Sequence, residues 1–177
     1  MHTEVAETSS WVTRFAPLIP VGGEVLDLAC GSGRHVRLLA GLGHYVEAVD
    51  RDAAALAQLS GVKGVSVRVA DIEHGPWPFA GRRFSGIVVT NYLHRPLLPL
   101  IEGALAEGGV LIYETFMLGN ERFGRPSNPD FLLRPQELLE MALAAGLRVV
   151  AYEEGEVRAP KPAVVQRLCA TKIASRT

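Results

Sequence analysis

Runs of apolar residues alternate along this chain with segments in which apolar residues recur at helical spacing. Residues 25–29 form a nearly continuous apolar run, which is typical of a strand buried on both faces. From 34 to 40 the spacing becomes helical, with Val36, Leu39 and Ala40 on one side. The pattern therefore predicts a strand, a sharp turn and a helix near the start of the chain.

The same alternation continues to the end of the sequence. Further strands are expected at 45–50, 65–70, 84–90, 109–116, 147–154 and 163–171, and further helices at 8–19, 52–59, 94–106 and 135–145. Strand and helix alternate until the last two strands, which a Pro-rich hairpin joins. This order predicts an α/β fold with a doubly wound, mostly parallel seven-stranded sheet, an antiparallel edge hairpin and helices on both faces. No linker divides the chain, so we expect a single domain over residues 1–177.

Composition adds few constraints. The net charge of -1 gives no global basic footprint, which argues against nucleic acid as a partner without excluding it. Cys30 and Cys169 lie far apart, so no disulfide framework and no metal site are expected. The N-terminus lacks a signal-peptide pattern, and no apolar run approaches the roughly 18–20 residues of a membrane span. We therefore expect a cytoplasmic protein, monomeric or homodimeric, that does not enter a membrane.

The turn after the first strand, Cys30-Gly31-Ser32-Gly33, joins that strand to a helix N-terminus. Such a junction binds anionic groups, because the first N–H groups of a helix have no internal partner. A nicotinamide-binding loop would have a third glycine where this chain has Val36, and here Asp27 lies inside the strand.

The string Val-Leu-Asp-Leu-Ala-Cys-Gly-Ser-Gly at 25–33 resembles the first motif of class I S-adenosylmethionine-dependent methyltransferases. The resemblance implies that S-adenosylmethionine is the cofactor and that Asp27, Ala29, Gly31 and Gly33 contact it. A looser likeness to small methyltransferases of the tellurite-resistance type covers residues 128–139.

Ligands of a doubly wound sheet bind at the carboxyl ends of its strands, so the residues that follow each strand are the next candidates. Asp50 ends the second strand and can accept hydrogen bonds from both ribose hydroxyls, with Arg51 beside it; the alternative is a solvated carboxylate that caps the next helix. The resemblance assigns Asp71 to the adenine amino group and the Ile72 amide to a ring nitrogen. Trp77 is either an adenine contact or a buried loop anchor.

Asn91-Tyr-Leu-His-Arg follows the fourth strand, where the family places the transferred methyl group. The segment departs from the Asn/Asp-Pro-Pro-Tyr/Phe motif of enzymes that methylate base amino groups. Asn91 can offer its carbonyl to the cofactor or the substrate. His94 is either a general base or a helix-capping histidine, and Tyr92 and Glu114 complete the candidate catalytic set.

Two segments have open roles. Residues 117–134 form either a substrate loop, with Arg122 and Arg125 favouring an anionic or electron-rich acceptor, or only a covering loop. Residues 1–20 contain either a helix packed on the sheet edge or a lid over the cofactor.

These observations lead to one hypothesis and three alternatives. The leading hypothesis is methyl transfer from S-adenosylmethionine to a small-molecule acceptor by in-line displacement. The alternatives are an RNA or protein methyltransferase, a non-catalytic S-adenosylmethionine-binding accessory protein and, last because of Val36 and Asp27, a nicotinamide dehydrogenase.

Overall fold

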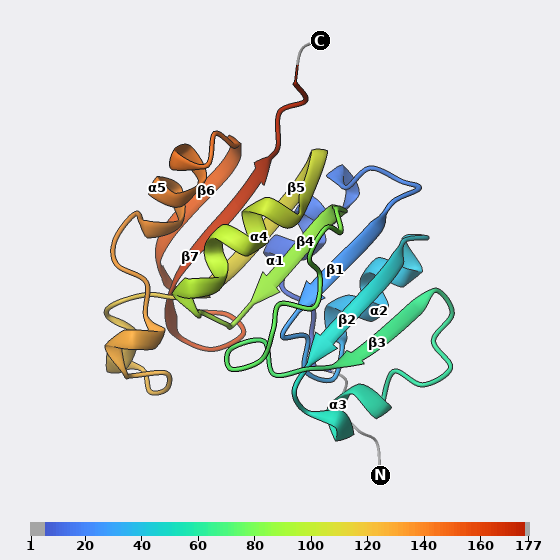
Figure 1. Cartoon of the computed structure of the whole chain (residues 1–177). Helices are drawn as coiled ribbons and strands as arrows, with labels where there is room; N and C mark the ends of the chain where they lie inside the picture. The colour runs from blue at the N-terminus through green and yellow to red at the C-terminus, as the bar shows by residue number, and fades with distance from the viewer. Residues whose placement is uncertain (1–5, 176–177) are drawn as a thin grey trace.

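The computed structural model describes residues 6–175 and contains one seven-stranded sheet with the order β3-β2-β1-β4-β5-β7-β6 (Figure 1). The strands are β1 (Glu24–Leu28), β2 (Tyr45–Asp50), β3 (Val65–Val69), β4 (Phe84–Thr90), β5 (Leu105–Phe116), β6 (Arg148–Val157) and β7 (Ala163–Thr171). The first five strands pair in parallel, and β7 lies antiparallel between β5 and β6. The predicted doubly wound sheet with an antiparallel pair at one edge is confirmed.

Helices cover both faces of the sheet. The α-helices are α1 (Ser10–Phe15), α2 (Arg34–Gly41), α3 (Ala53–Ala57), α4 (Leu98–Ala104) and α5 (Glu137–Ala144). Short 3-10 helices lie at η1 (Ala16–Leu18), η2 (Arg95–Leu97), η3 (Asn120–Arg122) and η4 (Pro129–Phe131). Apolar residues of α1, α2 and α3 pack on one face, and those of α4 and α5 pack on the other.

Side-chain alternation along the strands assigns the two faces. In β1, Leu26 and Leu28 join the core on the α4/α5 side, whereas Val25 joins the core under α1 and α2. Asp27 shares the parity of Val25 and therefore lies on the α1/α2 side, where it is almost fully buried. A carboxyl group is thus placed inside one of the two apolar cores.

The helix expected at 94–106 is wrong at both ends. Residues 95–97 are a 3-10 turn, α4 spans only Leu98–Ala104, and β5 begins at Leu105. The strand starts early because Leu105 pairs with Phe84 across the β4–β5 ladder and is fully buried there. Tertiary pairing has therefore overridden a helical sequence pattern.

Other differences are confined to element ends. The helices expected at 52–59 and 135–145 are shorter, because Asp52 caps α3 and Gln136 has a left-handed φ of 61° immediately before α5. Within residues 6–175, no helix is long and apolar enough to span a membrane. The described residues also contain no group of three or more His, Cys, Asp or Glu side chains that could hold a metal ion.

Candidate cofactor and acceptor site

The carboxyl ends of β1 to β5 meet at one edge of the sheet, and the backbone turns sharply there at two adjacent positions. Ala29 follows β1 and Asn91 follows the neighbouring β4, and each has a φ of 53°. This left-handed conformation costs an L-residue roughly 1–2 kcal/mol. Strained non-glycine residues cluster at functional sites, so the pair marks this edge as the candidate site.

The two glycines of the turn after β1 differ in what surrounds them. Gly31 has a φ of 56°, and a Cβ built on it would meet nothing within 4 Å. A Cβ on Gly33 would lie 2.5 Å from a methyl carbon of Leu59. Gly33 is therefore required for packing between the turn and the segment after α3, whereas Gly31 leaves open space at the surface of the loop.

Asp50 holds that loop in place from the end of β2. Its Oδ2 accepts a hydrogen bond from the Gly31 amide at 2.8 Å, and its Oδ1 accepts one from the Asp52 amide at 2.9 Å. Capping of α3 falls to Asp52, whose Oδ1 accepts from Ala54 and Ala55 at 3.0 Å. Each carboxylate oxygen of Asp50 keeps a second lone pair for a ligand hydroxyl.

Asp27 is buried without a full set of partners. The residue is 1% exposed, and its Oδ2 has no hydrogen-bond partner among the described residues. Burial raises the pKa of Asp27 to about 8; Arg34 opposes the shift and Asp50 adds to it. A buried, unpartnered carboxyl oxygen is costly, and a cationic ligand group would compensate it.

The Asp71–Ile72 pair follows β3. Asp71 Oδ1 accepts from the amides of Glu73 and His74 at 3.0 and 3.1 Å, and these bonds, chiefly that of His74, lower the pKa of Asp71. The Ile72 side chain is buried in the α4/α5-side core, while its amide makes no hydrogen bond to another described residue. A carboxylate acceptor and a free amide donor therefore lie side by side, and Arg51 is exposed at the same edge.

The segment after β4 connects this edge to its neighbours. The Tyr92 hydroxyl donates to Glu73 Oε1 at 2.8 Å, and Tyr113 donates to the Tyr92 carbonyl at 2.8 Å. Burial and the Glu73 carboxylate raise the pKa of Tyr92, so its hydroxyl is held protonated. His94 is half-buried and precedes η2 without a side-chain capping bond. The roles of Tyr92 and His94 in catalysis stay predictions.

Glu114 is paired with a cation. It lies on β5, is 8% exposed, and accepts a hydrogen bond from Arg167 Nε on β7. Arg167 also approaches Glu153 at 3.7 Å and stacks over the Trp11 ring at 6.0 Å. The predicted catalytic carboxylate is therefore part of a mostly buried ion pair between two antiparallel strands.

The N-terminal helix is anchored at both the sheet and the site. Trp11 is 3% exposed and donates its ring N–H to the Leu168 carbonyl at 3.2 Å. His35, which the sequence analysis left without a role, accepts from the Ser9 amide at 2.9 Å and faces Thr90 at the end of β4 at 3.4 Å. Burial and then Arg34 lower the pKa of His35 to about 4. A neutral imidazole thus connects the start of α1 to the candidate site.

Residues 117–134, which we call the cap loop, fold against the end of the sheet where β4 and β5 finish (Figure 1). Met117 and Leu133 form an isolated bridge that closes the base of the loop. Arg122 lies 3.6 Å from Glu156 and stacks on Phe123, and Arg125 is exposed. Asn120 Oδ1 accepts from the Val164 amide at 3.1 Å, and Arg95 holds the part of the loop around Asp130. Arg95 was not singled out from the sequence, because its partner Glu137 is 42 positions away.

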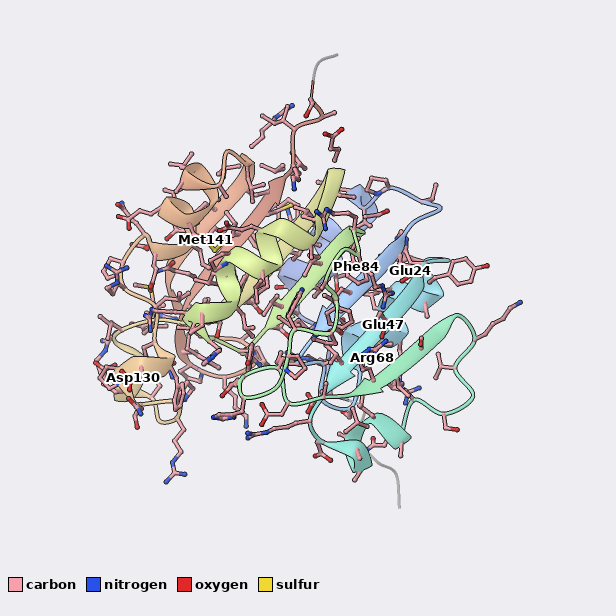
Figure 2. The ribbon with its side chains drawn as sticks, in the orientation of Figure 1. Glu24, Glu47, Arg68, Phe84, Asp130 and Met141 are labelled. Carbon is pink, nitrogen blue, oxygen red and sulfur yellow. The ribbon has the colours of Figure 1, made fainter. Side chains whose placement is uncertain are left out.

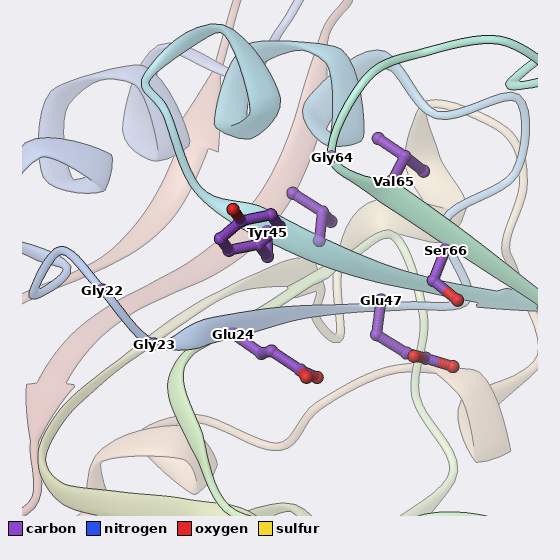
Figure 3. A pocket seen from close by; sticks show the side chains of 9 residues that line it. Gly22, Gly23, Glu24, Tyr45, Glu47, Gly64, Val65 and Ser66 are labelled. Atoms are coloured by element: carbon purple, nitrogen blue, oxygen red, sulfur yellow. The ribbon is translucent and has the colours of Figure 1, made fainter.

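A cavity of about 500 Å³ lies elsewhere, at the amino ends of β1 to β3 (Figure 3). The Glu24 and Glu47 side chains extend on the same side of it, and both are paired with Arg82. Figure 2 shows Glu24, Glu47 and Arg68 close together, on the other side of the molecule from Asp130 of the cap loop. Because ligands of doubly wound sheets bind at the carboxyl ends, this cavity is not the candidate site.

Comparisons with known proteins agree with this fold. Residues 25–109 match the family model described as a methyltransferase domain. TehB from Haemophilus influenzae is 22% identical, with a TM-score of 0.72 over 90% of this chain and 61% of that protein, so this chain spans about three fifths of its length. A Methanosarcina mazei S-adenosylmethionine-dependent methyltransferase is 14% identical, with a TM-score of 0.72 over 96% of this chain and 100% of that one.

A third structure was solved with a ligand. The glycopeptide N-methyltransferase MtfA complexed with sinefungin is 19% identical, with a TM-score of 0.66 over 94% of each chain. At these identities the structural matches establish the fold. No curated protein matches the chain in sequence.

Proposed function

We propose that the chain is an S-adenosylmethionine-dependent methyltransferase of class I and that its acceptor is a small molecule, since residues 25–109 match the methyltransferase-domain family model. The observation that carries the cofactor assignment is the unpartnered Oδ2 of Asp27, buried at the edge where the strands end. The small-molecule assignment is supported by the cap loop, which lies beside the ends of β4 and β5, and by a net charge of -1.

We propose that each strand end holds one part of the cofactor. Asp27 offsets the positive charge of the amino and sulfonium groups. The turn from Ala29 to Gly33 receives the methionine portion, with the open space at Gly31. Asp50, whose oxygens keep free lone pairs, accepts from the ribose hydroxyls. Further contacts come from Asp71 and the Ile72 amide to the adenine, from Asn91 to the methionine portion, and from Arg51 at the rim.

The bound cofactor supplies a methyl group on a leaving group that is already activated. The protein then has to align the acceptor atom with that methyl group and exclude water, and alignment alone can supply several kcal/mol. His94 takes the proton of an acceptor that is protonated at neutral pH. Tyr92, with its hydroxyl held by Glu73, and Glu114, held by Arg167, shape the walls of the site through these partners.

The test separates cofactor binding from acceptor class. Calorimetry with S-adenosylhomocysteine measures binding directly, and S-adenosylmethionine labelled in its methyl group is incubated with small-molecule, RNA and protein fractions of a cell extract. We expect binding, and label in the small-molecule fraction only. Label in RNA or protein would contradict the acceptor assignment, and absence of binding would contradict the cofactor assignment.

His94 is tested in the same assay. Replacing a general base typically lowers the rate by about a hundredfold or more, so we expect His94→Asn to lose at least that factor while S-adenosylhomocysteine affinity is retained. An unchanged rate would show that the acceptor needs no base.

A further inference from the structure

Arg95 connects three separate parts of the chain through one guanidinium group. Its Nε donates to Glu137 Oε1 at 2.7 Å and its Nη2 to Glu137 Oε2 at 3.0 Å, which is the two-point geometry of a strong arginine–carboxylate pair. The same group donates to the backbone carbonyls of Asp130 at 3.0 Å and Leu132 at 2.9 Å, both in the cap loop.

Glu137 is well satisfied in this arrangement. It is 6% exposed at the start of α5, and it also accepts from the Arg134 amide at 2.8 Å. Burial alone would raise the pKa of Glu137, but the hydrogen bonds from Arg95 and Arg134 outweigh it and lower the pKa. The carboxylate therefore stays charged and fixes the orientation of the guanidinium.

Apolar burial does little to hold the outer part of the cap loop. Its large apolar side chains remain exposed to a substantial degree: Leu118 (40%), Phe123 (40%) and Phe131 (52%). Leu132 and Leu133 are buried at its base. The polar contacts of Arg95 are thus the main link between the segment around Asp130 and the body of the protein.

Arg95 belongs to the short segment after β4 that contacts both the cap loop and the proposed cofactor side. Arg95 directly follows His94 in the segment after β4, and Tyr92 of the same segment bonds to Glu73 beside the proposed adenine contacts. Tyr92 thus extends toward the cofactor side and Arg95 toward the cap loop. One short segment sets the spacing between the two halves of the site.

We propose that Arg95 is a positioning residue that builds the acceptor site by clamping the cap loop to the end of β4. The inference rests on the proposed function, since it assigns the cap loop to the acceptor. It requires that loss of the clamp loosen the loop and weaken acceptor binding while the cofactor half remains intact.

The discriminating variant is Arg95→Lys. Lysine keeps a positive charge beside the buried Glu137, so the carboxylate still has a counter-charge. However, a lysine side chain cannot form the two-point pair with Glu137 and also donate to the carbonyls of Asp130 and Leu132. The matched control is Arg82→Lys, because Arg82 also pairs with a buried carboxylate, Glu47, at 3.3 Å, but lies beside the cavity at the amino ends of the strands, away from the cap loop.

Three measurements are made on each full-length variant. Hydrogen exchange reports the order of residues 118–133, calorimetry reports S-adenosylhomocysteine affinity, and the rate of label transfer is followed along a dilution series of the small-molecule extract. The dilution series separates the half-saturating extract concentration from the maximal rate without requiring the identity of the acceptor.

For Arg95→Lys we expect exchange in 118–133 to be about tenfold faster and the half-saturating concentration to rise about tenfold, with cofactor affinity unchanged. Arg82→Lys should leave all three values near those of the wild type. Unchanged exchange in 118–133, or an equal loss of cofactor affinity, would overturn the proposal. If no fraction accepts label, that result counts only against the proposed function. The hydrogen-exchange result still tests whether Arg95 clamps the cap loop.

Discussion

The proposed cofactor half and the proposed acceptor half of the site are built by different means. At the ends of β1, β2 and β3, carboxylates bond to backbone amides of nearby turns: Asp50 to Gly31, and Asp71 to His74. At the ends of β4 and β5, side chains pair with charged partners far along the chain: Arg95 with Glu137, and Glu114 with Arg167.

This difference determines which contacts can be predicted from nearby residues in the sequence. The Asp71 bond needs only the turn beside the strand, and the Asp50 bond to Gly31 needs only the pairing of β1 with β2, 19 positions apart. An ion pair across 42 or 53 positions needs the complete fold. If the two halves also behave as separate units, a substitution in one half should leave the properties of the other half unchanged.

Replacing Asp50 should disable the cofactor half. Asp50→Ala removes the acceptor of the Gly31 amide and the proposed ribose acceptor, two charge-assisted interactions, so S-adenosylhomocysteine affinity should fall about a thousandfold by calorimetry. Asp52→Ala is the control, because it removes only the α3 cap and should cost about 1 kcal/mol of stability. Equal affinity loss in both variants would refute a specific role for Asp50.

The pH dependence of binding should be set by Asp27. Its pKa is raised to about 8 by burial, with Arg34 opposing and Asp50 adding to the shift, so the cationic cofactor must displace a proton below that pH. S-adenosylmethionine affinity should therefore fall about tenfold per pH unit below 8 and level off above it. Asp27→Asn should flatten this profile, and calorimetry in buffers of different ionisation enthalpy should detect the released proton.

The same group affects the stability of the ligand-free protein in the opposite direction. Because the folded pKa of Asp27 is raised, the native state binds more protons than the unfolded state between about pH 4 and pH 8. The contribution of Asp27 to stability is therefore greatest below pH 4 and is lost as the pH rises through 8. In denaturant unfolding, the free energy of unfolding of Asp27→Asn should rise relative to that of the wild type as the pH increases from 4 to 8. A difference that does not change with pH would contradict the raised pKa of Asp27.

Breaking the Glu114–Arg167 pair should affect stability and leave cofactor binding alone. Glu114→Gln leaves Arg167 largely buried without its main counter-charge, so we expect a loss of about 2 kcal/mol in denaturant unfolding. The double variant with Arg167→Met should recover part of that loss. If Glu114→Gln instead stops methyl transfer with stability intact, Glu114 acts directly on the acceptor.

The sequence was sufficient for the sheet and for the strand positions of Asp27, Asp50 and Asp71, whose roles in cofactor binding stay predictions. Continuous apolar runs identified β1 and β4, and Asp27, Asp50 and Asp71 follow from their places in or directly after parallel strands. These inferences succeed because strand burial and strand-end position are local properties.

The partners of the residues in the proposed acceptor half could not be predicted from the sequence, for a physical reason. Glu114 meets Arg167 only because β7 inserts beside β5, and the start of β5 at Leu105 depends on pairing with Phe84. His35 likewise gains its role only when Ser9 comes to lie beside it. Such contacts carry no periodicity or motif, so a single sequence gives no signal for them.

The smallest expected effect concerns Arg34, which influences the pKa of Asp27 in the proposed cofactor half. Arg34 lowers the pKa of Asp27, and it donates to the Glu7 carbonyl at 2.7 Å in a solvent-exposed hydrogen bond that contributes little stability. Arg34→Gln should move the bend of the affinity profile to higher pH and leave the plateau above it unchanged. Arg37→Gln, which removes a charge from the same helix and a bond to Gln58, should not move the bend. A uniform loss of affinity at every pH would mean instead that Arg34 contacts the cofactor itself, because a direct contact acts on both protonation states of Asp27 alike.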